Sequence, residues 1–211
     1  MPPVRDPADD GTTVRASTER GPTERGPLWI FGYGSLIWRP DFVWAERRTA
    51  RVTDRARRFW QGSHDHRGVP GAPGRVVTLV PEPGGRCEGM AWRIADERAE
   101  ETLARLDHRE KDGYVRERLV LHLDDGRRVT ATTWVASPLN PSWLGPAPLD
   151  ELAATIRSSA GPSGTNADYV LSLADGLERL GFADPHVAEL ATRLRRSQAS
   201  PECRSRPSSS S

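Results

Sequence analysis

The stretch YVRERLVLHLDDGRRVTATTWVA, residues 114–136, decides the fold. Two runs rich in aliphatic, β-branched and aromatic residues, Tyr114 to Leu123 and Arg127 to Ala136, are joined by Asp-Asp-Gly at 124–126. An Asp-Gly pair between two such runs is the strongest short-range signal for a β-hairpin. The stretch therefore predicts two neighbouring antiparallel strands.

Further strands are expected on the N-terminal side of this hairpin. Leu28 to Phe31 is a short apolar run that ends at Gly32, which is typical of a buried strand entering a glycine turn. Arg75 to Val80 and Cys87 to Ile94 flank the segment PEPGG at 81–85. Proline and glycine between two apolar runs predict a loop or hairpin that separates two strands.

Four segments show the spacing of helices. One begins at Asp96, which can cap it, and ends near Asp107. Three others follow the strands, at Leu149 to Ala160, Asn166 to Leu180 and Pro185 to Arg196. Because helices do not alternate regularly with strands, the sequence predicts an α+β fold, with an antiparallel or mixed, barrel-like sheet and flanking helices, and argues against a Rossmann sheet.

Composition limits the folded part to one domain at residues 28–198. Residues 1–27 mix Pro, Gly, Thr and both charges without a period, and residues 199–211 are polar and end in a serine run. Such segments bury too little apolar area to offset the entropy lost on ordering. We therefore expect a disordered leader and a disordered tail around the domain.

Charge and cysteine content exclude several classes of partner. The 211 residues carry 30 basic and 29 acidic side chains, so no strong field attracts nucleic acid or an anionic membrane. No apolar run is long enough to span a bilayer or to form the core of a signal peptide. Two cysteines are too few for a disulfide framework. We expect a cytoplasmic protein, a monomer or weak dimer, without nucleic-acid or membrane partners.

The first candidate site is the turn Gly32-Tyr33-Gly34-Ser35-Leu36. Two glycines let the backbone approach a ligand closely, and consecutive N–H groups can bind a carboxylate or an oxyanion. The turn lacks the third glycine of a dinucleotide site, the Gly-Lys-Ser/Thr of a phosphate loop and the Gly-x-Ser-x-Gly of serine hydrolases. An ordinary tight turn is the alternative interpretation.

The second candidate is LDHREKDGY at 106–114, where a helix ends and a strand begins. Glu110 is best placed to face a sheet pocket, and apolar walls there would raise its pKa toward the range useful for proton transfer. The next residue, Lys111, is the single lysine of an otherwise arginine-only chain. A solvated charged loop is the alternative interpretation.

Two further segments are polar. In residues 57–68, His64 and His66 are too few ligands for a zinc site, so a polar loop lining a pocket or structural hydrogen bonding is favoured, and no metal is expected. The loop at 161–166 leads into a helix carrying Tyr169. Its free N–H groups could hold a ligand carboxylate, or the loop could simply cap the helix.

Five stretches join these motifs into one longer pattern: FGYGSLIW (31–38), RRFWQGSHDHRGVPGAPGRVVTL (57–79), LDHREKDGY (106–114), WLGPAP (143–148) and GPSGTNADYV (161–170). In this order and spacing they resemble the ChaC-type γ-glutamylcyclotransferases. The resemblance covers nearly the whole expected domain. It implies a compact barrel-like fold, no cofactor, and cleavage of glutathione to 5-oxoproline and cysteinylglycine.

The resemblance also implies roles for individual residues. Glu110 would be the catalytic carboxylate, acting as general base and then as general acid. The residues expected to bind substrate are Phe31, Gly32, Tyr33, Gly34, Ser35, Leu36, Arg67, Tyr114 and Tyr169. Alternatives are the same reaction on a γ-glutamyl amino acid or γ-glutamylamine, and a binding module that holds γ-glutamyl groups without turnover.

Overall fold

The structure is a computed structural model that describes residues 26–110 and 113–199. Most of the leader expected at 1–27 and most of the tail expected at 199–211 lie outside the described residues, as does Lys111. Nothing in the structure therefore tests those predictions.

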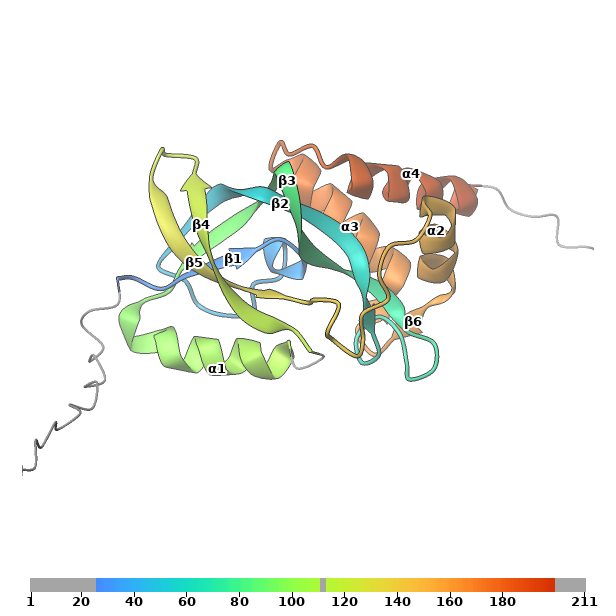
Figure 1. Cartoon of the computed structure of the whole chain (residues 1–211), viewed down its shortest axis with the longest axis horizontal. Coiled ribbons are helices and arrows are strands. Elements are labelled where there is room, and N and C mark those ends of the chain that lie inside the picture. The colour runs from blue at the N-terminus through green and yellow to red at the C-terminus, as the bar shows by residue number, and fades with distance from the viewer. Residues whose placement is uncertain (1–25, 111–112, 200–211) are drawn as a thin grey trace, which may run out of the picture.

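In the described part of the chain, five strands close into a barrel (Figure 1). They are β1 (Trp29–Gly32), β2 (Glu46–Ser63), β3 (Gly74–Arg93), β4 (Val115–Leu123) and β5 (Arg128–Val135). The order around the barrel is β1-β3-β2-β4-β5, and the pairing of β1 with β5 is parallel while the other pairings are antiparallel. The predicted α+β fold with a mixed, barrel-like sheet is confirmed.

The hairpin predicted at 114–136 is confirmed to within a residue at each end. β4 and β5 pair from Val115 opposite Val135 to His122 opposite Arg128. Gly126 has φ of +87°, a backbone conformation that glycine adopts without steric cost. The Asp-Asp-Gly segment therefore makes the turn that its composition predicts.

The hairpin expected at PEPGG (81–85) is wrong. β3 runs through this segment as one strand, because the residues on both sides of it pair with the same neighbour, β2. Arg86 lies opposite Thr53 and Pro81 lies opposite Arg55, so the extra residues bulge out of a continuous ladder. A local cluster of proline and glycine indicates that regular pairing with the neighbouring strand is interrupted. Whether the chain also reverses direction there depends on which strand its two sides pair with.

The polar loop expected at 57–68 is also partly wrong, because residues 57–63 form the end of β2. The sequence analysis had predicted no strand over 46–63. Asp54 has φ of +56° and sits at a shift in register with β3, which breaks the alternation of buried and exposed residues in an arginine-rich strand. Residues 64–73 do form a loop.

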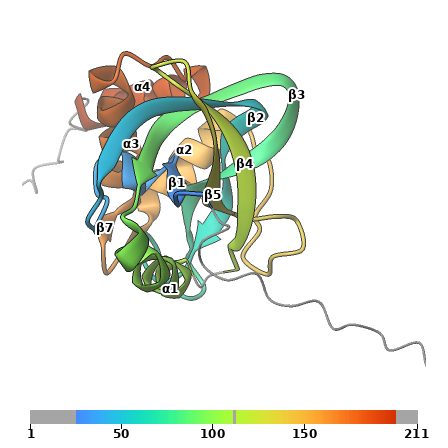
Figure 2. The same cartoon turned by 90° about the vertical axis from the view of Figure 1, so that its left-hand side faces the viewer.

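The helices lie in two places around the barrel (Figures 1 and 2). They are the short 3₁₀ helices η2 (Ser35–Ile37) and η3 (Asp96–Arg98) and the α-helices α1 (Ala99–Arg109), α2 (Leu149–Ser158), α3 (Asn166–Arg179) and α4 (Pro185–Ala199). α1 covers one side of the barrel, whereas α2, α3 and α4 pack against one another on another side. The expected cap by Asp96 is wrong, because neither η3 nor α1 has a side-chain cap bond and α1 starts three residues later and ends at Arg109.

Two short strands, β6 (Ala160–Gly161) and β7 (Gly164–Thr165), form a small hairpin directly before α3. None of the helices in the described ranges combines the length and apolarity that a membrane crossing requires.

Candidate active site

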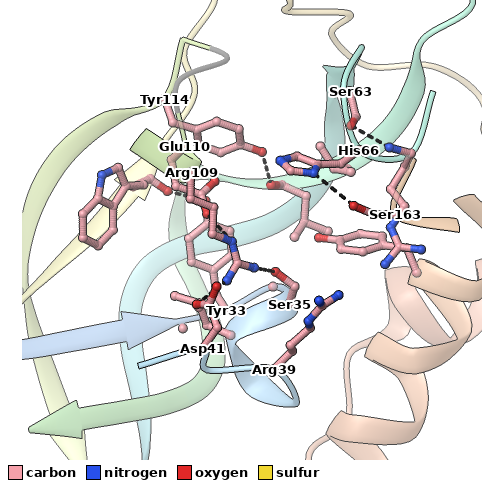
Figure 3. A pocket seen from close by; sticks show the side chains of 18 of the residues that line it. Tyr33, Ser35, Arg39, Asp41, Ser63, His66, Arg109, Glu110, Tyr114 and Ser163 are labelled. Carbon is pink, nitrogen blue, oxygen red and sulfur yellow. Dashed lines mark hydrogen bonds and ion pairs between the residues drawn. The ribbon is translucent and has the colours of Figure 1, made fainter. Parts of the chain in front are cut away.

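A pocket of about 430 Å³ opens where β1, β2, α1 and α3 meet (Figure 3). It is walled by the turn after β1, the end of β2 with the loop that follows, the C-terminal end of α1 and the first turn of α3. All ten residues predicted to act at a site lie on its wall, namely Phe31, Gly32, Tyr33, Gly34, Ser35, Leu36, Arg67, Glu110, Tyr114 and Tyr169. The structure thus brings these residues together, and the role of each stays a prediction.

The glycine turn is packed so closely that side chains would not fit. A β-carbon on Gly32 would lie 2.7 Å from that of Leu36, and one on Gly34 would lie 3.0 Å from Cγ2 of Val77 and 3.1 Å from the hydroxyl of Tyr169. The N–H groups of residues 34–36 precede the first hydrogen bond of η2 and have no backbone acceptor in the described chain. Residues 34–36 line the pocket, so their N–H groups are candidate donors to a ligand oxygen.

Glu110 follows the last residue of α1, and its N–H donates to Leu106 O at 2.9 Å. Its side chain is 23% exposed and faces the pocket (Figure 3). Burial raises the pKa of Glu110 above its ordinary value, Asp41 and Asp65 raise it further, and the positive charges of Arg109 and His66 oppose the rise. A carboxyl group with a raised pKa can both accept and return a proton near neutral pH.

Arg109 connects this carboxylate to the glycine turn. Its guanidinium donates to Asp41 Oδ1 at 2.8 Å and to Ser35 Oγ at 2.6 Å, and its Nε lies 3.4 Å from Glu110 Oε1. Figure 3 shows Arg109 between Glu110, Asp41 and Ser35. The sequence pattern does not reveal Arg109 and Asp41 as pocket residues, because the partners of Arg109, Asp41 and Ser35, lie 68 and 74 residues away from it along the chain.

Three tyrosines form rigid walls of the pocket. The hydroxyl of Tyr33 donates to Trp134 O at 2.5 Å, and that of Tyr114 donates to Val77 O at 2.7 Å. Burial raises the pKa of Tyr33 well above its ordinary value and is the main cause that raises the pKa of Tyr169 to about 12. The hydroxyls of Tyr33 and Tyr169 therefore stay protonated at neutral pH and bring no charge into the pocket.

The loop after β2 carries Arg67 and His66 to the opposite wall. Arg67 N–H donates to Ser63 Oγ at 3.0 Å, and His66 Nδ1 lies 3.1 Å from Ser163 Oγ (Figure 3). Within residues 26–110 and 113–199, no group of three or more His, Cys, Asp or Glu side chains is arranged to hold a metal ion.

The loop at 161–166 caps α3, as one of the two interpretations predicted. Thr165 Oγ1 accepts a hydrogen bond from Asp168 N–H at 3.0 Å. The same loop places Ser163 on the rim of the pocket, and Tyr169 follows one turn into the helix. Capping and lining the pocket are thus done by one short segment.

Comparison with known proteins now identifies the family. The family model described as ChaC-like protein matches residues 28–197. The chain belongs to the ChaC-like family. Its match begins at the first residue of the predicted domain and ends one residue before the predicted last one, and the boundaries 28–198 themselves stay a prediction.

Two relatives of this ChaC-like chain and one solved structure show how far the similarity extends. A human protein named glutathione-specific gamma-glutamylcyclotransferase 1 is 38% identical over 194 residues, which cover 89% of this chain and 87% of the relative. The Escherichia coli (strain K12) glutathione-specific gamma-glutamylcyclotransferase is 35% identical, with 81% and 74% covered. A crystal structure of a gamma-glutamyl cyclotransferase specific to glutathione from yeast superposes with a TM-score of 0.76 at 28% identity, covering 81% of this chain and 96% of the other.

Proposed function

We propose that the chain is a glutathione-specific γ-glutamylcyclotransferase, a lyase that needs no cofactor and converts glutathione to 5-oxoproline and cysteinylglycine. Family membership and the names of the relatives support this proposal. One observation carries it: a mostly buried carboxylate with a raised pKa, Glu110, shares a pocket with a turn of free N–H groups and is linked to that turn through Arg109.

The first step is removal of a proton. The glutamyl α-ammonium of glutathione cannot attack until it loses a proton to a base within hydrogen-bond reach. Ionised Glu110 is that base. Hydrogen bonds to Asp41 and Ser35 fix the guanidinium of Arg109, and this positive charge in turn positions the carboxylate of Glu110.

The second step closes the ring. The amine nitrogen forms a bond to the γ-carbonyl carbon within the same molecule, so the pocket promotes the reaction by holding the folded conformer and needs no enzyme nucleophile. Negative charge develops on the carbonyl oxygen, and the N–H groups of residues 34–36 are the donors available to it. The bond to the cysteinyl nitrogen then breaks as protonated Glu110 gives its proton to that nitrogen. The ring nitrogen loses its second proton to the Glu110 carboxylate, which passes it to the released amine, so that cysteinylglycine leaves as an ammonium and Glu110 is again ionised.

The experiment is an assay of 5-oxoproline release from glutathione by Glu110→Gln. We expect kcat to fall by about 10²- to 10⁴-fold, the usual contribution of a general acid–base, while glutathione still binds. Glu101→Gln is the matched control. Glu101 also belongs to α1, but its side chain is 75% exposed and does not line the pocket. Release by Glu110→Gln near the wild-type rate would refute the assignment.

A second substrate tests the specificity. γ-Glutamyl-alanine carries the same glutamyl group without the cysteinylglycine portion, so comparing its kcat/KM with that of glutathione separates a glutathione enzyme from a general γ-glutamyl cyclotransferase. Binding of glutathione in calorimetry without product would favour a binding module.

We also propose that the protein works in the cytoplasm as a monomer or weak dimer. Cys87 is free and buried in the barrel, which fits a reducing compartment. Sedimentation of the purified chain measures the oligomeric state.

A further inference from the structure

The arginines on the pocket wall fall into two groups. Arg105 and Arg109 both form ion pairs with Asp41, at 3.5 and 2.8 Å, and Arg109 also faces Glu110. Arg39 and Arg67 line the same pocket, and neither forms an ion pair with any carboxylate in the described residues. The pocket wall therefore carries two arginines that have no ion-pair partner among residues 26–110 and 113–199.

Arg67 is held in place by groups without a full negative charge. Its guanidinium donates to Thr165 O at 3.1 Å and lies over the ring of Tyr169, with 5.5 Å from Cζ to the ring centroid. Burial is the main cause that lowers the pKa of Arg67; Tyr169 and Asp168 oppose this change, and the positive charge of Arg39 adds to it. An anion between the two arginines would oppose the effect of Arg39.

Of the described residues, neither acidic group near this part of the pocket forms an ion pair with Arg39 or Arg67. Asp65 lies 3.7 Å from His66, and exposed Asp168 acts on Arg67 at longer range without forming an ion pair. Figure 3 shows Arg39 next to Ser35, on the side of the pocket away from Glu110.

Tyr169 lies between the glycine turn and the guanidinium of Arg67. Its hydroxyl approaches the turn, at 3.1 Å from the position of a β-carbon on Gly34, while its ring face carries Arg67. One tyrosine side chain thus separates the turn from the guanidinium. Two extended residues span at most about 7 Å, so cysteinylglycine attached to a γ-carbonyl at the turn is comparable in length with the tyrosine side chain that separates the turn from Arg67.

We propose that Arg39 and Arg67 form the subsite that binds the glycyl carboxylate of glutathione, at the opposite end of the substrate from the bond that breaks. This inference rests on the proposed function. A guanidinium binds a carboxylate through two parallel hydrogen bonds, so the pair recognises an anionic tripeptide end. γ-Glutamylamines lack that carboxylate, and the subsite therefore selects glutathione against them.

The test compares reduced glutathione with its C-terminal amide, γ-glutamyl-cysteinyl-glycinamide, which lacks only the glycyl charge. In wild type we expect kcat/KM to be about 10- to 100-fold higher for glutathione, the usual effect of one or two charge-assisted hydrogen bonds. In the double variant Arg39→Gln/Arg67→Gln this ratio should fall to about 1, through a higher KM for glutathione and little change for the amide. Arg105→Gln is the matched control, a lining arginine that already has a carboxylate partner, and it should keep the wild-type ratio.

The amide also controls for misfolding, because a misfolded variant loses activity toward both substrates. The single variant Arg39→Gln removes no side-chain hydrogen bond or ion pair with the described residues, so it should fold and still lower the ratio. The subsite is overturned if wild type uses both substrates equally or if the double and single variants keep the preference for glutathione. If wild type releases no 5-oxoproline from either substrate, the proposed function fails together with the subsite.

Discussion

Replacing Arg57 with methionine tests how the glycine turn is anchored to the rest of the barrel. Arg57 is the largest fully buried side chain of the described residues, and only 1% of its side chain is exposed. It donates to Tyr33 O at 2.7 Å, to Asp184 Oδ2 at 2.6 Å and to Glu88 O. One guanidinium therefore ties the glycine turn to β3 and to the residue that precedes α4.

The expected loss follows from what the substitution leaves behind. Methionine keeps much of the aliphatic packing but leaves the carboxylate of Asp184 without its cation, and it removes the guanidinium donor from the carbonyls of Tyr33 and Glu88. Removing one partner of a buried ion pair typically costs about 3–5 kcal/mol. Since a domain is stable by only about 5–15 kcal/mol, this loss should be obvious in urea unfolding followed by circular dichroism.

Arg195→Met is the matched control. Arg195 pairs with Asp175 at the same distance, 2.6 Å, but the two side chains are 52% and 47% exposed. An exposed pair contributes about 0–1 kcal/mol, so the control should unfold almost like wild type. If Arg57→Met lowers the free energy of unfolding no more than Arg195→Met does, burial does not strengthen the contribution of the Arg57–Asp184 ion pair, and the reasoning is refuted.

Three further predictions concern the pocket. Because Glu110 must be ionised to act as base, kcat/KM should decrease as the pH falls through its raised pKa, with a midpoint above the ordinary glutamate value of about 4.3; a lower midpoint would contradict the effect of burial. Folding raises the pKa of Glu110, so the stabilisation linked to this group is present at low pH and is lost as the pH rises through the folded-state pKa. Glutamine carries no charge at any pH, so Glu110→Gln should have a higher Tm than wild type at pH 7 but not at about pH 3. Gly32→Ala places a β-carbon 2.7 Å from that of Leu36, so we expect a loss of about 1–3 kcal/mol and a lower kcat/KM. Gly26→Ala, with no atom within 4 Å, is its control, and equal effects of the two substitutions would show that packing at the turn is not tight.

Some elements were predictable because their signals are local. The turn at 124–126 sets the hairpin, the apolar run before Gly32 sets β1, and helical spacing sets α2, α3 and α4. The 106–114 motif indicated Glu110 from its place between a helix and a strand. Each of these signals depends on residues within a few positions of one another.

Other features depended on contacts between distant segments. The sequence did not reveal that β2 is a strand or that β3 is continuous, because each is defined by its pairing with the other across a bulge at Asp54. It also could not reveal that Arg109 reaches Asp41 and Ser35.

The amino-acid sequence by itself therefore determined the fold class, the glycine turn and the acidic residue at the end of α1. Only the tertiary structure decided which charges of the pocket are paired, how far Glu110 is buried and which arginines are left for a ligand. The physical reason is that backbone conformation responds to near neighbours, whereas ion pairing and desolvation depend on what the folded chain brings together from far apart.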